Sequence, residues 1–412
     1  MNIVYLSSEY PPETGFGGIA TYTRYSALTM SRRGHRVQVI SRSLQQSSTL
    51  RKAEGVTVHR IPPVHYPLPQ GKLFFPIRTL FYRAIPQSLI RYTWAKAAAH
   101  TCRELARREA IDILEFPECG AEGYFISGLK ATVTVARLHT PWEMVRELDD
   151  IAESLPDRIV LGHCERQAVA KARLVTSPSR ALADIVRTRW SLKSVTAYPN
   201  PIAPEEFPLT KGGAWIYTGR VEKRKGVHLL LQAYRLLGET MRPPPLLLLG
   251  KPYGTSTSGK QYAQEVEELV AQCSQVGKVS WIKGVEHCEV KNYLQQSSAA
   301  IFPSLWENFP YACMEAMACG CTVIAARCGG YPEMVANRQT GLLFATGDAN
   351  DLADKLQFAI ENPDIARELG MQARRFVSEH FSCEKLGAGI EDMYLSALID
   401  QTHGQTARHS TH

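Results

Sequence analysis

Short apolar runs alternate with longer stretches of helical spacing along the first half of the chain. Ile19–Arg33 has helical spacing and ends at Gly34, a residue type that commonly terminates helices. The apolar runs are rich in β-branched residues and too short for helices, so each predicts a buried strand. Strands that alternate with helices form a parallel sheet covered on both faces. The predicted strands are Ile3–Ser7, His35–Ser41, Val56–Ile61, Ile111–Glu115, Thr132–Arg137 and Arg173–Ser177.

The segment Tyr198–Pro204 interrupts this rhythm with three prolines in seven residues, which is typical of a connector. The alternation then resumes, so we predict two α/β domains, 1–203 and 204–380. A helical stretch follows over 381–399, and the polar residues 400–412 are expected to be disordered. The predicted strands of the second domain are Trp215–Thr218, Leu246–Leu249, Lys278–Ile282, Ala299–Phe302 and Thr322–Ala326.

Composition narrows the class of protein. The chain has 412 residues, of which 44% are hydrophobic and 21% charged, values that exclude intrinsic disorder and collagen-like repeats. It has no apolar run of about 18 residues that would span a bilayer, and its first residues do not resemble a secretory signal. The ten cysteines show no metal-site spacing, the nearest pair being Cys319 and Cys321. We therefore expect reduced thiols and a cytoplasmic protein.

Charge is distributed unevenly between the two halves. The net charge is +7, with +10 in residues 1–200 and −3 in the remainder, which suggests domains with different partners. Within the basic half, Lys72–Arg108 interleaves aromatic and basic side chains. Such a segment can lie on an anionic membrane surface or contact an acceptor, or it can pack against the core with a solvated basic face. Pro76 and Pro86 interrupt any long amphipathic helix, and the sequence leaves both interpretations open.

The glycine-rich stretch Gly15–Ala20 lies between a predicted strand and a predicted helix. Exposed amides at a helix N-terminus attract phosphate, and the spacing also satisfies the dinucleotide-binding pattern. Two features argue against a nicotinamide cofactor. The first glycine lies eight residues beyond Ser7, and the second strand ends in Arg42 without a ribose-binding acid, although Arg42 is able to accept a 2′-phosphate. A plain turn is the other interpretation of the stretch.

A second candidate site is the loop Gly219–Gly226, which follows a strand and opens a helix. Arg220 and Lys225 are five positions apart and can converge on one anionic ligand. A solvated basic turn is the common alternative for such a charge run. The position at the carboxyl end of a strand favours a site, because open α/β sheets bind ligands there.

The third candidate is Phe302–Met317, where a strand leads through a loop into a helix. Glu307 lies in the loop and Glu315 eight residues later within the helix, a spacing that lets the two carboxylates bind different hydroxyls of one ligand. The amides between Asn308 and Tyr311 would point from the helix start toward an oxyanion or sugar hydroxyls. Paired carboxylates also occur in glycosidases, where both flank the scissile bond. Alternatively, Glu315 is a solvated helix residue.

Taken in order, these motifs resemble a retaining, nucleotide-sugar-dependent glycosyltransferase of family 4. The resemblance extends to about Ile399 and implies the GT-B fold, an α/β architecture of two facing Rossmann-like domains with a cleft between them. It implies that residues 1–203 bind the acceptor, that 204–380 bind the donor, and that helix 381–399 crosses back to the first domain. The motifs are the glycine loop, Arg137–Trp142, Pro199–Ile202, Arg220 with Lys225–Gly226, Glu307 with Glu315, and Gly329–Glu333.

The resemblance also implies roles for residues of the donor domain. Arg220 and Lys225 would neutralise the donor diphosphate and stabilise the leaving group. Glu315 would bind the ribose hydroxyls, and Glu307 would hold the donor sugar. Further donor contacts are implied for Asn308, Phe309, Pro310 and Gly330.

In the acceptor domain, Gly17 and Gly18 would lie against the diphosphate, and His139 near the transferred sugar. No cofactor or metal is expected: the chain has no Asp-x-Asp motif, its only adjacent Asp pair being Asp149-Asp150, and two basic side chains can replace a divalent cation. Since no side chain of the motifs is placed as a nucleophile, front-face substitution is expected.

The resemblance leaves several matters open. Pro201 stands where glycine is commoner, as do Asn308 and Pro310, and the latter two bear on donor-sugar selection. The expected partners are a UDP- or GDP-linked hexose or N-acetylhexosamine and a sugar, lipid-linked or small-molecule acceptor, with no nucleic acid and with peripheral membrane contact through 72–108 as an option. The alternatives are a sugar-nucleotide epimerase, an NADP-dependent oxidoreductase that uses Gly15–Ala20, and a binding protein without catalysis.

Overall fold

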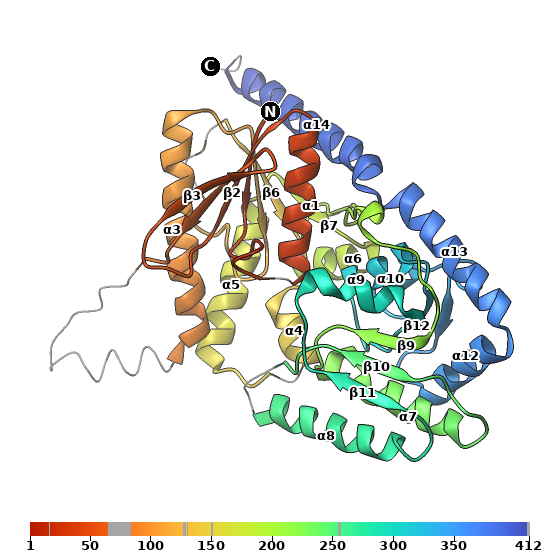
Figure 1. Cartoon of the computed structure of the whole chain (residues 1–412). Helices are drawn as coiled ribbons and strands as arrows, with labels where there is room; N and C mark the ends of the chain where they lie inside the picture. The colour runs from red at the N-terminus through yellow and green to blue at the C-terminus, as the bar shows by residue number, and fades with distance from the viewer. Residues whose placement is uncertain are drawn as a thin grey trace. The chain divides into compact units, whose positions relative to one another are not determined.

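The structure, a computed structural model, describes residues 1–15, 17–64, 84–126, 129, 131–149, 151–253 and 257–409, without the side chains of 257–260 and 402–409. The chain forms two units, each described by itself. The first comprises Met1–Val145, Glu153–Pro201 and Cys383–His412, and the second Arg146–Ala152 and Ile202–Ser382. Each unit is an α/β domain built on its own sheet, which agrees with the predicted fold class (Figure 1).

The sheet of the first unit has the strand order β3-β4-β2-β1-β5-β6-β7-β8, with every pair parallel except β3 and β4. The inner strands β1, β2 and β5 are buried on both faces, as their continuous apolar runs predict. The strand bounds are β1 Asn2–Leu6, β2 Arg36–Arg42, β3 Thr49–Ala53, β4 Val56–Ile61, β5 Ile113–Pro117, β6 Val133–Arg137, β7 Leu174–Ser177 and β8 Thr196–Ala197.

Helices cover both faces of this sheet (Figure 1). On one face α1 and α14 pack against a core that includes Tyr5, Met30 and Tyr394, and α3 and α5 lie on the other. The helices are α1 Gly18–Arg32, α3 Pro86–Arg108, α4 Trp142–Leu148, α5 Leu155–Lys171, α6 Arg180–Arg189 and α14 Cys383–His409. The last residues of α4, from Arg146, are counted with the second unit.

The second unit has a wholly parallel sheet of order β11-β10-β9-β12-β13-β14. A core between this sheet and helices α7, α8 and α12 includes Tyr217, Leu230 and Phe344, and α9, α10 and α13 pack on the other face. The strands are β9 Ala214–Thr218, β10 Leu246–Leu249, β11 Val279–Ile282, β12 Ser297–Phe302, β13 Thr322–Ala326 and β14 Leu342–Phe344. The helices are α7 Val227–Gly238, α8 Thr257–Cys273, α9 His287–Gln295, α10 Tyr311–Ala318, α11 Tyr331–Met334, α12 Ala349–Glu361 and α13 Pro363–His380, with short 3-10 turns η2 at Pro204–Glu206 and η3 at Lys223–Lys225.

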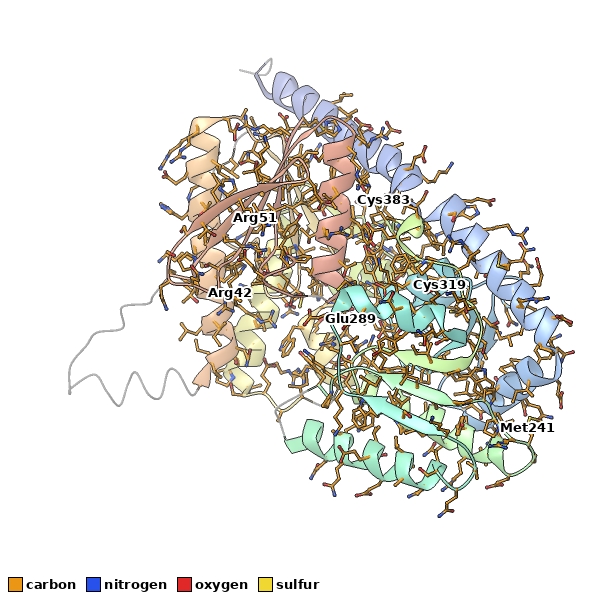
Figure 2. The ribbon with its side chains drawn as sticks, viewed as in Figure 1. Arg42, Arg51, Met241, Glu289, Cys319 and Cys383 are labelled. Carbon is orange, nitrogen blue, oxygen red and sulfur yellow. The ribbon has the colours of Figure 1, made fainter. Side chains whose placement is uncertain are left out.

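Three strands escaped prediction because they carry little apolar signal or are very short. Every residue of β3 is exposed, Arg51 among them (Figure 2), so the strand shows no alternation of apolar and polar positions. A hairpin turn joins it to β4 through Glu54 and Gly55, whose φ angles of 51° and 79° suit a tight type I′ turn. The other two strands, β8 and β14, have two and three residues.

The C-terminal residues differ from prediction in their secondary structure. Residues 400–412 were expected to be disordered, but α14 continues through His409. No proline follows Pro363 in the sequence to end the helix, and polar residues such as Gln and Arg are good helix formers.

The basic aromatic segment lies partly outside the described residues, since its first part, 72–83, is not described. In its described part, α3, Leu89 and Trp94 are buried in the core, whereas Ile90 is about half exposed. This portion therefore packs as a core helix. Within the described residues, no helix is both long and apolar enough to cross a membrane.

Candidate functional site

Two loops of the second unit meet at the carboxyl ends of β9 and β12. The β9–α7 loop turns at Gly226, where φ is +66° and an added Cβ would lie 2.0 Å from the carbonyl oxygen of Pro303. Only glycine fits this approach without displacing backbone. The amide of Leu305 donates to the carbonyl oxygen of Arg224 at 2.7 Å. The Gly219–Gly226 loop and the β12–α10 loop are thus joined backbone to backbone.

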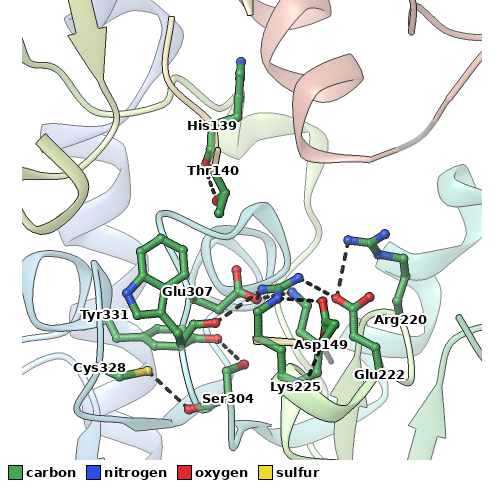
Figure 3. Close-up of polar contacts among 12 residues, drawn as sticks. His139, Thr140, Asp149, Arg220, Glu222, Lys225, Ser304, Glu307, Cys328 and Tyr331 are labelled. Carbon is green, nitrogen blue, oxygen red and sulfur yellow. Dashed lines mark hydrogen bonds and ion pairs between the residues drawn. The ribbon is translucent and has the colours of Figure 1, made fainter. Parts of the chain in front are cut away.

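Arg224 forms the centre of an ion cluster between these loops. Its side chain is 7% exposed, and its guanidinium contacts three carboxylates: Nη1 lies 2.5 Å from Glu307 Oε1, Nη2 2.5 Å from Glu222 Oε1, and Nε 3.3 Å from Asp149 Oδ2. Burial by itself would lower the pKa of Arg224, but the charges of Glu307, Glu222 and Asp149 raise it above its ordinary value. Arg224 is therefore a permanent buried cation. Figure 3 shows Asp149, Glu222 and Glu307 in this cluster.

Glu307 and Lys225, to both of which the resemblance gives a role in donor binding, are in direct contact. Lys225 Nζ lies 2.5 Å from Glu307 Oε1 (Figure 3). Burial would raise the pKa of Glu307, but the positive charges of Lys225 and Arg224 outweigh it and hold the pKa below its ordinary value. Glu307 is thus an ionised carboxylate. Both ion pairs end on Oε1 of Glu307.

Arg220 occupies the outer side of the same loop. Its Nη2 lies 3.4 Å from Glu222 Oε1, and its guanidinium carbon lies 4.1 Å from the centroid of the Tyr253 ring. About half of the Arg220 side chain is exposed. The solvated-turn interpretation of this loop is therefore wrong for Arg224 and Glu222, which are buried, while Arg220 keeps a charge that a ligand can reach.

The loop after Glu307 continues into α10 and carries Asn308, Phe309 and Pro310, whose donor contacts are predictions. Asn308 and Phe309 are buried, and the Phe309 ring packs edge to face on Phe381 at 5.2 Å between ring centroids. The side chain of Phe309 is thus committed to the core, so a ligand contact would have to use its amide. Pro310 is the N-cap residue of α10, and its side chain makes no capping hydrogen bond.

Glu315 lies one helical turn into α10 and is buried, so the solvated-residue interpretation of it is wrong. Its Oε1 lies 3.2 Å from Nε2 of His287, the first residue of α9. A buried carboxylate held by an imidazole keeps acceptor capacity for hydroxyl groups. Sequence reasoning did not single out His287, because a lone histidine at a helix start carries no motif.

The Gly329–Gly330 turn lies directly against Glu307. The Gly330 amide donates to the Glu307 carbonyl oxygen at 2.9 Å. At Gly329 φ is +50°, and an added Cβ would lie 1.8 Å from that same oxygen. The turn thus holds the backbone of Glu307 through its carbonyl oxygen.

The predicted residues of the first unit lie at the ends of α1 and β6. Gly17 is the N-cap of α1 and Gly18 its first residue, and both are exposed. Among the described residues, leaving out its chain neighbours and nearby helix backbone, a Cβ added at Gly18 would meet no heavy atom within 4 Å. Packing against those residues therefore does not require glycine at Gly18.

His139 follows β6 and is held through its backbone. Its amide donates to both carboxylate oxygens of Glu118, at 2.8 Å each. Burial and the charge of Arg137 lower the pKa of His139 to about 3. The imidazole is therefore neutral near pH 7 and can exchange hydrogen bonds with a hydroxyl, but it does not supply positive charge.

Glu118 gives the first unit a testable dependence on pH. Burial raises its pKa from 4.5 to about 8, so between these values the folded chain holds a proton that the unfolded chain has lost. Stability therefore falls as pH rises through this window. We expect Glu118→Gln to make that fall shallower, by at most about 1.4 kcal/mol per pH unit, in urea unfolding at pH 5 to 8.

The control for this measurement is Glu104→Gln, which changes a partly exposed carboxylate paired with Arg107 on α3 and should leave the slope unchanged. Glu122 and Glu165, whose pKa values burial raises to about 7, contribute a slope of the same sign in every variant. An identical slope in Glu118→Gln and the wild type would show that Glu118 is ionised in the folded state.

The structure therefore gathers Arg220, Lys225, Glu307 and Gly330 around one point of the second unit. The residues that sequence reasoning missed there are Glu222 and Arg224, which belong to a basic run that looks solvated, and Asp149, which comes from a distant part of the chain. Among the residues that the structure describes, no group of histidine, cysteine or carboxylate side chains could hold a metal ion.

Two family models match consecutive parts of the sequence. The model described as Glycosyltransferase Family 4 matches residues 16–206, and the model described as Glycosyl transferases group 1 matches residues 204–376. The chain belongs to glycosyltransferase family 4. This glycosyltransferase has the GT-B fold that the resemblance predicted, with its two parallel-sheet units. The assignment favours glycosyl transfer over the oxidoreductase and epimerase alternatives.

Relatives of this glycosyltransferase carry different enzyme names. It is 26% identical over 411 residues to the D-inositol 3-phosphate glycosyltransferase of Stackebrandtia nassauensis, a match that covers 92% of this chain and 88% of the relative. It is 30% identical over 260 residues to the alpha-maltose-1-phosphate synthase of Mycolicibacterium smegmatis, covering 56% of this chain and 65% of that relative's length.

Solved structures share the fold of this glycosyltransferase at low identity. Sucrose-phosphate synthase from Thermosynechococcus elongatus superposes with a TM-score of 0.73 at 20% identity, covering 97% of this chain and 99% of the other. The Anabaena protein HepE in complex with UDP-glucose gives a TM-score of 0.67 at 16% identity, covering 96% of this chain and 100% of the other.

Proposed function

We propose that this glycosyltransferase moves a hexosyl or N-acetylhexosaminyl group from a UDP- or GDP-linked sugar to a hydroxyl of a sugar, lipid-linked or small-molecule acceptor, with retention of anomeric configuration. The observation that carries the proposal is the buried, ionised Glu307 in contact with Lys225 at the carboxyl ends of β9 and β12. Open α/β sheets bind ligands at this edge. The complex of HepE with UDP-glucose, a protein of the same fold, supports a nucleotide-sugar donor.

In this proposal the Gly219–Gly226 loop holds the donor diphosphate. Arg220 and Lys225 carry charges that a diphosphate would neutralise, and the planar Arg220 guanidinium can donate to two phosphate oxygens at once. Arg224 does not take part directly, since its guanidinium is already shared by three buried carboxylates. The two cations that remain supply the electrostatic stabilisation that a divalent metal supplies elsewhere, so we propose a metal-independent reaction.

Two carboxylates then bind the hydroxyls of the donor. Glu315, with one oxygen held by His287, accepts from the ribose hydroxyls. Glu307 accepts from a hydroxyl of the transferred sugar through Oε2, and the amides of Asn308 and Phe309 at the start of α10 complete the contact. An ionised Glu307 accepts more strongly than a neutral one, and its cation neighbours keep it ionised.

The bond changes follow from a site whose motifs contain no nucleophile. The bond between the anomeric carbon and the diphosphate oxygen breaks as the acceptor oxygen bonds to the same face of that carbon. The acceptor proton passes to an oxygen of the leaving diphosphate, whose negative charge Arg220 and Lys225 neutralise. Neutral His139 and the glycines at the start of α1 are proposed to contact the transferred sugar and the diphosphate, respectively.

The net charge of the first half of the chain is the basis for a proposal about the acceptor. The first half of the chain carries a net charge of +10, which favours an anionic acceptor such as a phosphorylated sugar or a lipid-linked phosphate. The name of the relative from Stackebrandtia nassauensis contains an inositol phosphate. Inositol phosphate is an anion, which agrees with the anionic acceptor that the positive charge favours.

Binding of a nucleotide sugar tests the proposal. We expect one of the UDP-, GDP- or ADP-sugars, with EDTA present, to raise the unfolding temperature, since a ligand at 100 times its Kd stabilises by about 2.7 kcal/mol. Glu315→Ala should abolish the shift, because the ribose hydroxyls lose their acceptor. Glu368→Ala, an exposed carboxylate on α13, is the matched control and should keep it.

The remaining outcomes of this panel decide against the proposal. A rise of the unfolding temperature with NADP alone would indicate that the Gly15–Ala20 loop binds a dinucleotide. A shift that survives in Glu315→Ala would remove Glu315 from the donor site. Binding without any release of nucleoside diphosphate, in the presence of sugar acceptors, would favour a binding protein.

A further inference from the structure

Residues Arg146–Ala152 belong to the second unit although they come from the first half of the chain. They lie at the end of α4, between β6 and α5, and the domain limits 1–203 and 204–380 did not anticipate them. The side chain of Asp149 in this segment is 5% exposed. A carboxylate is rarely buried unless its charge is paired, so its partners indicate why it is there.

Both oxygens of Asp149 bind one residue of the Gly219–Gly226 loop. The backbone amide of Arg224 donates to Oδ1 at 3.0 Å, and Nε of the same residue donates to Oδ2 at 3.3 Å. The carboxylate thus holds the backbone and the side chain of Arg224 together. Figure 3 shows Asp149 in the ion cluster.

The other hydrogen-bond donors of the Arg224 side chain connect it to the rest of the site. Its Nη1 reaches Glu307 Oε1 and, at 3.3 Å, the carbonyl oxygen of Trp306, while Nη2 reaches Glu222 Oε1. Glu222 in turn pairs with Arg220. Arg224 is therefore the common partner of the loop that carries Arg220 and Lys225 and of the loop that carries Glu307.

We propose that Asp149 is a positioning residue for the donor diphosphate, acting through Arg224 to fix Lys225 and Arg220 in place. This rests on the proposed role of those two cations. Without the carboxylate, the Arg224 amide and Nε lose their acceptors, and the short turn η3 that ends at Lys225 is no longer anchored on this side. Lys225 then samples more positions, and the diphosphate loses a fixed counter-charge.

A purely structural role for Asp149 makes a different prediction from a positioning role. If the role is structural, the substitution should change folding stability and weaken the binding of all nucleotides alike. If Asp149 positions the cations, the substitution should weaken the binding of nucleoside diphosphates more than that of monophosphates. The ratio of the Kd values of UMP and UDP, with GMP and GDP as the second pair, separates the two roles.

The experiment measures both Kd values by calorimetry on the full chain for Asp149→Asn, which keeps the side-chain volume. We expect the Kd of the nucleoside diphosphate to rise about 10-fold, as for loss of one hydrogen bond to a charged group, while that of the monophosphate changes less than about twofold. Asp364→Asn, an exposed carboxylate on α13, should change neither value. If Asp149→Asn lowers the unfolding temperature, Asp149→Glu, which keeps the charge, takes its place in the same comparison.

An unchanged ratio in the Asp149 variants overturns the inference. Lys225→Ala, measured beside them, separates this failure from failure of the proposed function. If Lys225→Ala weakens the diphosphate and the Asp149 variants do not, only the positioning role is wrong. If Lys225→Ala leaves the ratio unchanged as well, the proposed diphosphate site is wrong.

Discussion

Replacing Lys225 with alanine is expected to slow release of nucleoside diphosphate from the donor by about 10²-fold or more. The lysine lies 2.5 Å from Glu307, and the proposed reaction places the growing charge of the leaving diphosphate beside it. Its side chain is 17% exposed, so the loss should fall mainly on the transition state and less on folding. Steady-state release of nucleoside diphosphate, with the nucleotide sugar that the binding panel identifies, measures the effect.

The matched control is Lys223→Ala, two positions earlier in the same basic run and exposed. It removes the same charge from the same loop and should release nucleoside diphosphate at nearly the wild-type rate. Arg220→Ala is expected to resemble Lys225→Ala, because both cations would face the diphosphate. Near-normal turnover in a folded Lys225→Ala variant would mean that Lys225 does not contribute to the reaction.

Replacing Arg224 with alanine should instead destabilise the second unit, by about 3–5 kcal/mol. The substitution removes a cation that Asp149, Glu222 and Glu307 share, and all three carboxylates are buried. Breaking a buried ion pair leaves uncompensated charge in a medium of low polarity, which costs more than an exposed pair ever contributes. Urea unfolding followed by tryptophan fluorescence at pH 7 measures the loss.

Arg235→Ala on α7 is the control for this measurement, because Arg235 is exposed and bonds only to the side chain of Gln272 among the contacts described. It should change the unfolding free energy by less than about 0.5 kcal/mol. A loss below about 1 kcal/mol in Arg224→Ala would mean that the three carboxylates find other partners or take up protons. Arg224 and Lys225 are neighbours in sequence, so opposite outcomes for stability and turnover would separate a structural cation from a catalytic one.

Prediction from sequence succeeded where the signal is local. Strands such as β1 and β12 are continuous apolar runs because helices cover both faces of a parallel sheet, and such runs can be recognised in isolation. The edge strand β3 could not be recognised, since none of its residues is buried. The helical continuation of α14 to His409 was missed for a related reason, because a polar sequence does not by itself distinguish helix from disorder.

The candidate site shows the same division. The family resemblance implies that Glu307 and Lys225 both belong to the donor site, and the structure joins the two side chains by an ion pair. Glu315 is buried, which its position within a helix did not reveal. The roles of His139, Gly17 and Gly18 in the first unit remain predictions.

The sequence by itself determined the alternation of strands and helices, the connector near Pro201 and the residues at the carboxyl ends of β9 and β12. These follow from spacing within about 20 residues, which the backbone geometry of helices and strands dictates. Only the tertiary structure decided that Arg224 is buried and that Asp149, 75 residues earlier, binds its backbone and side chain. Burial and charge pairing depend on which distant segments pack together, so a basic run looks the same in sequence whether water or carboxylates surround it.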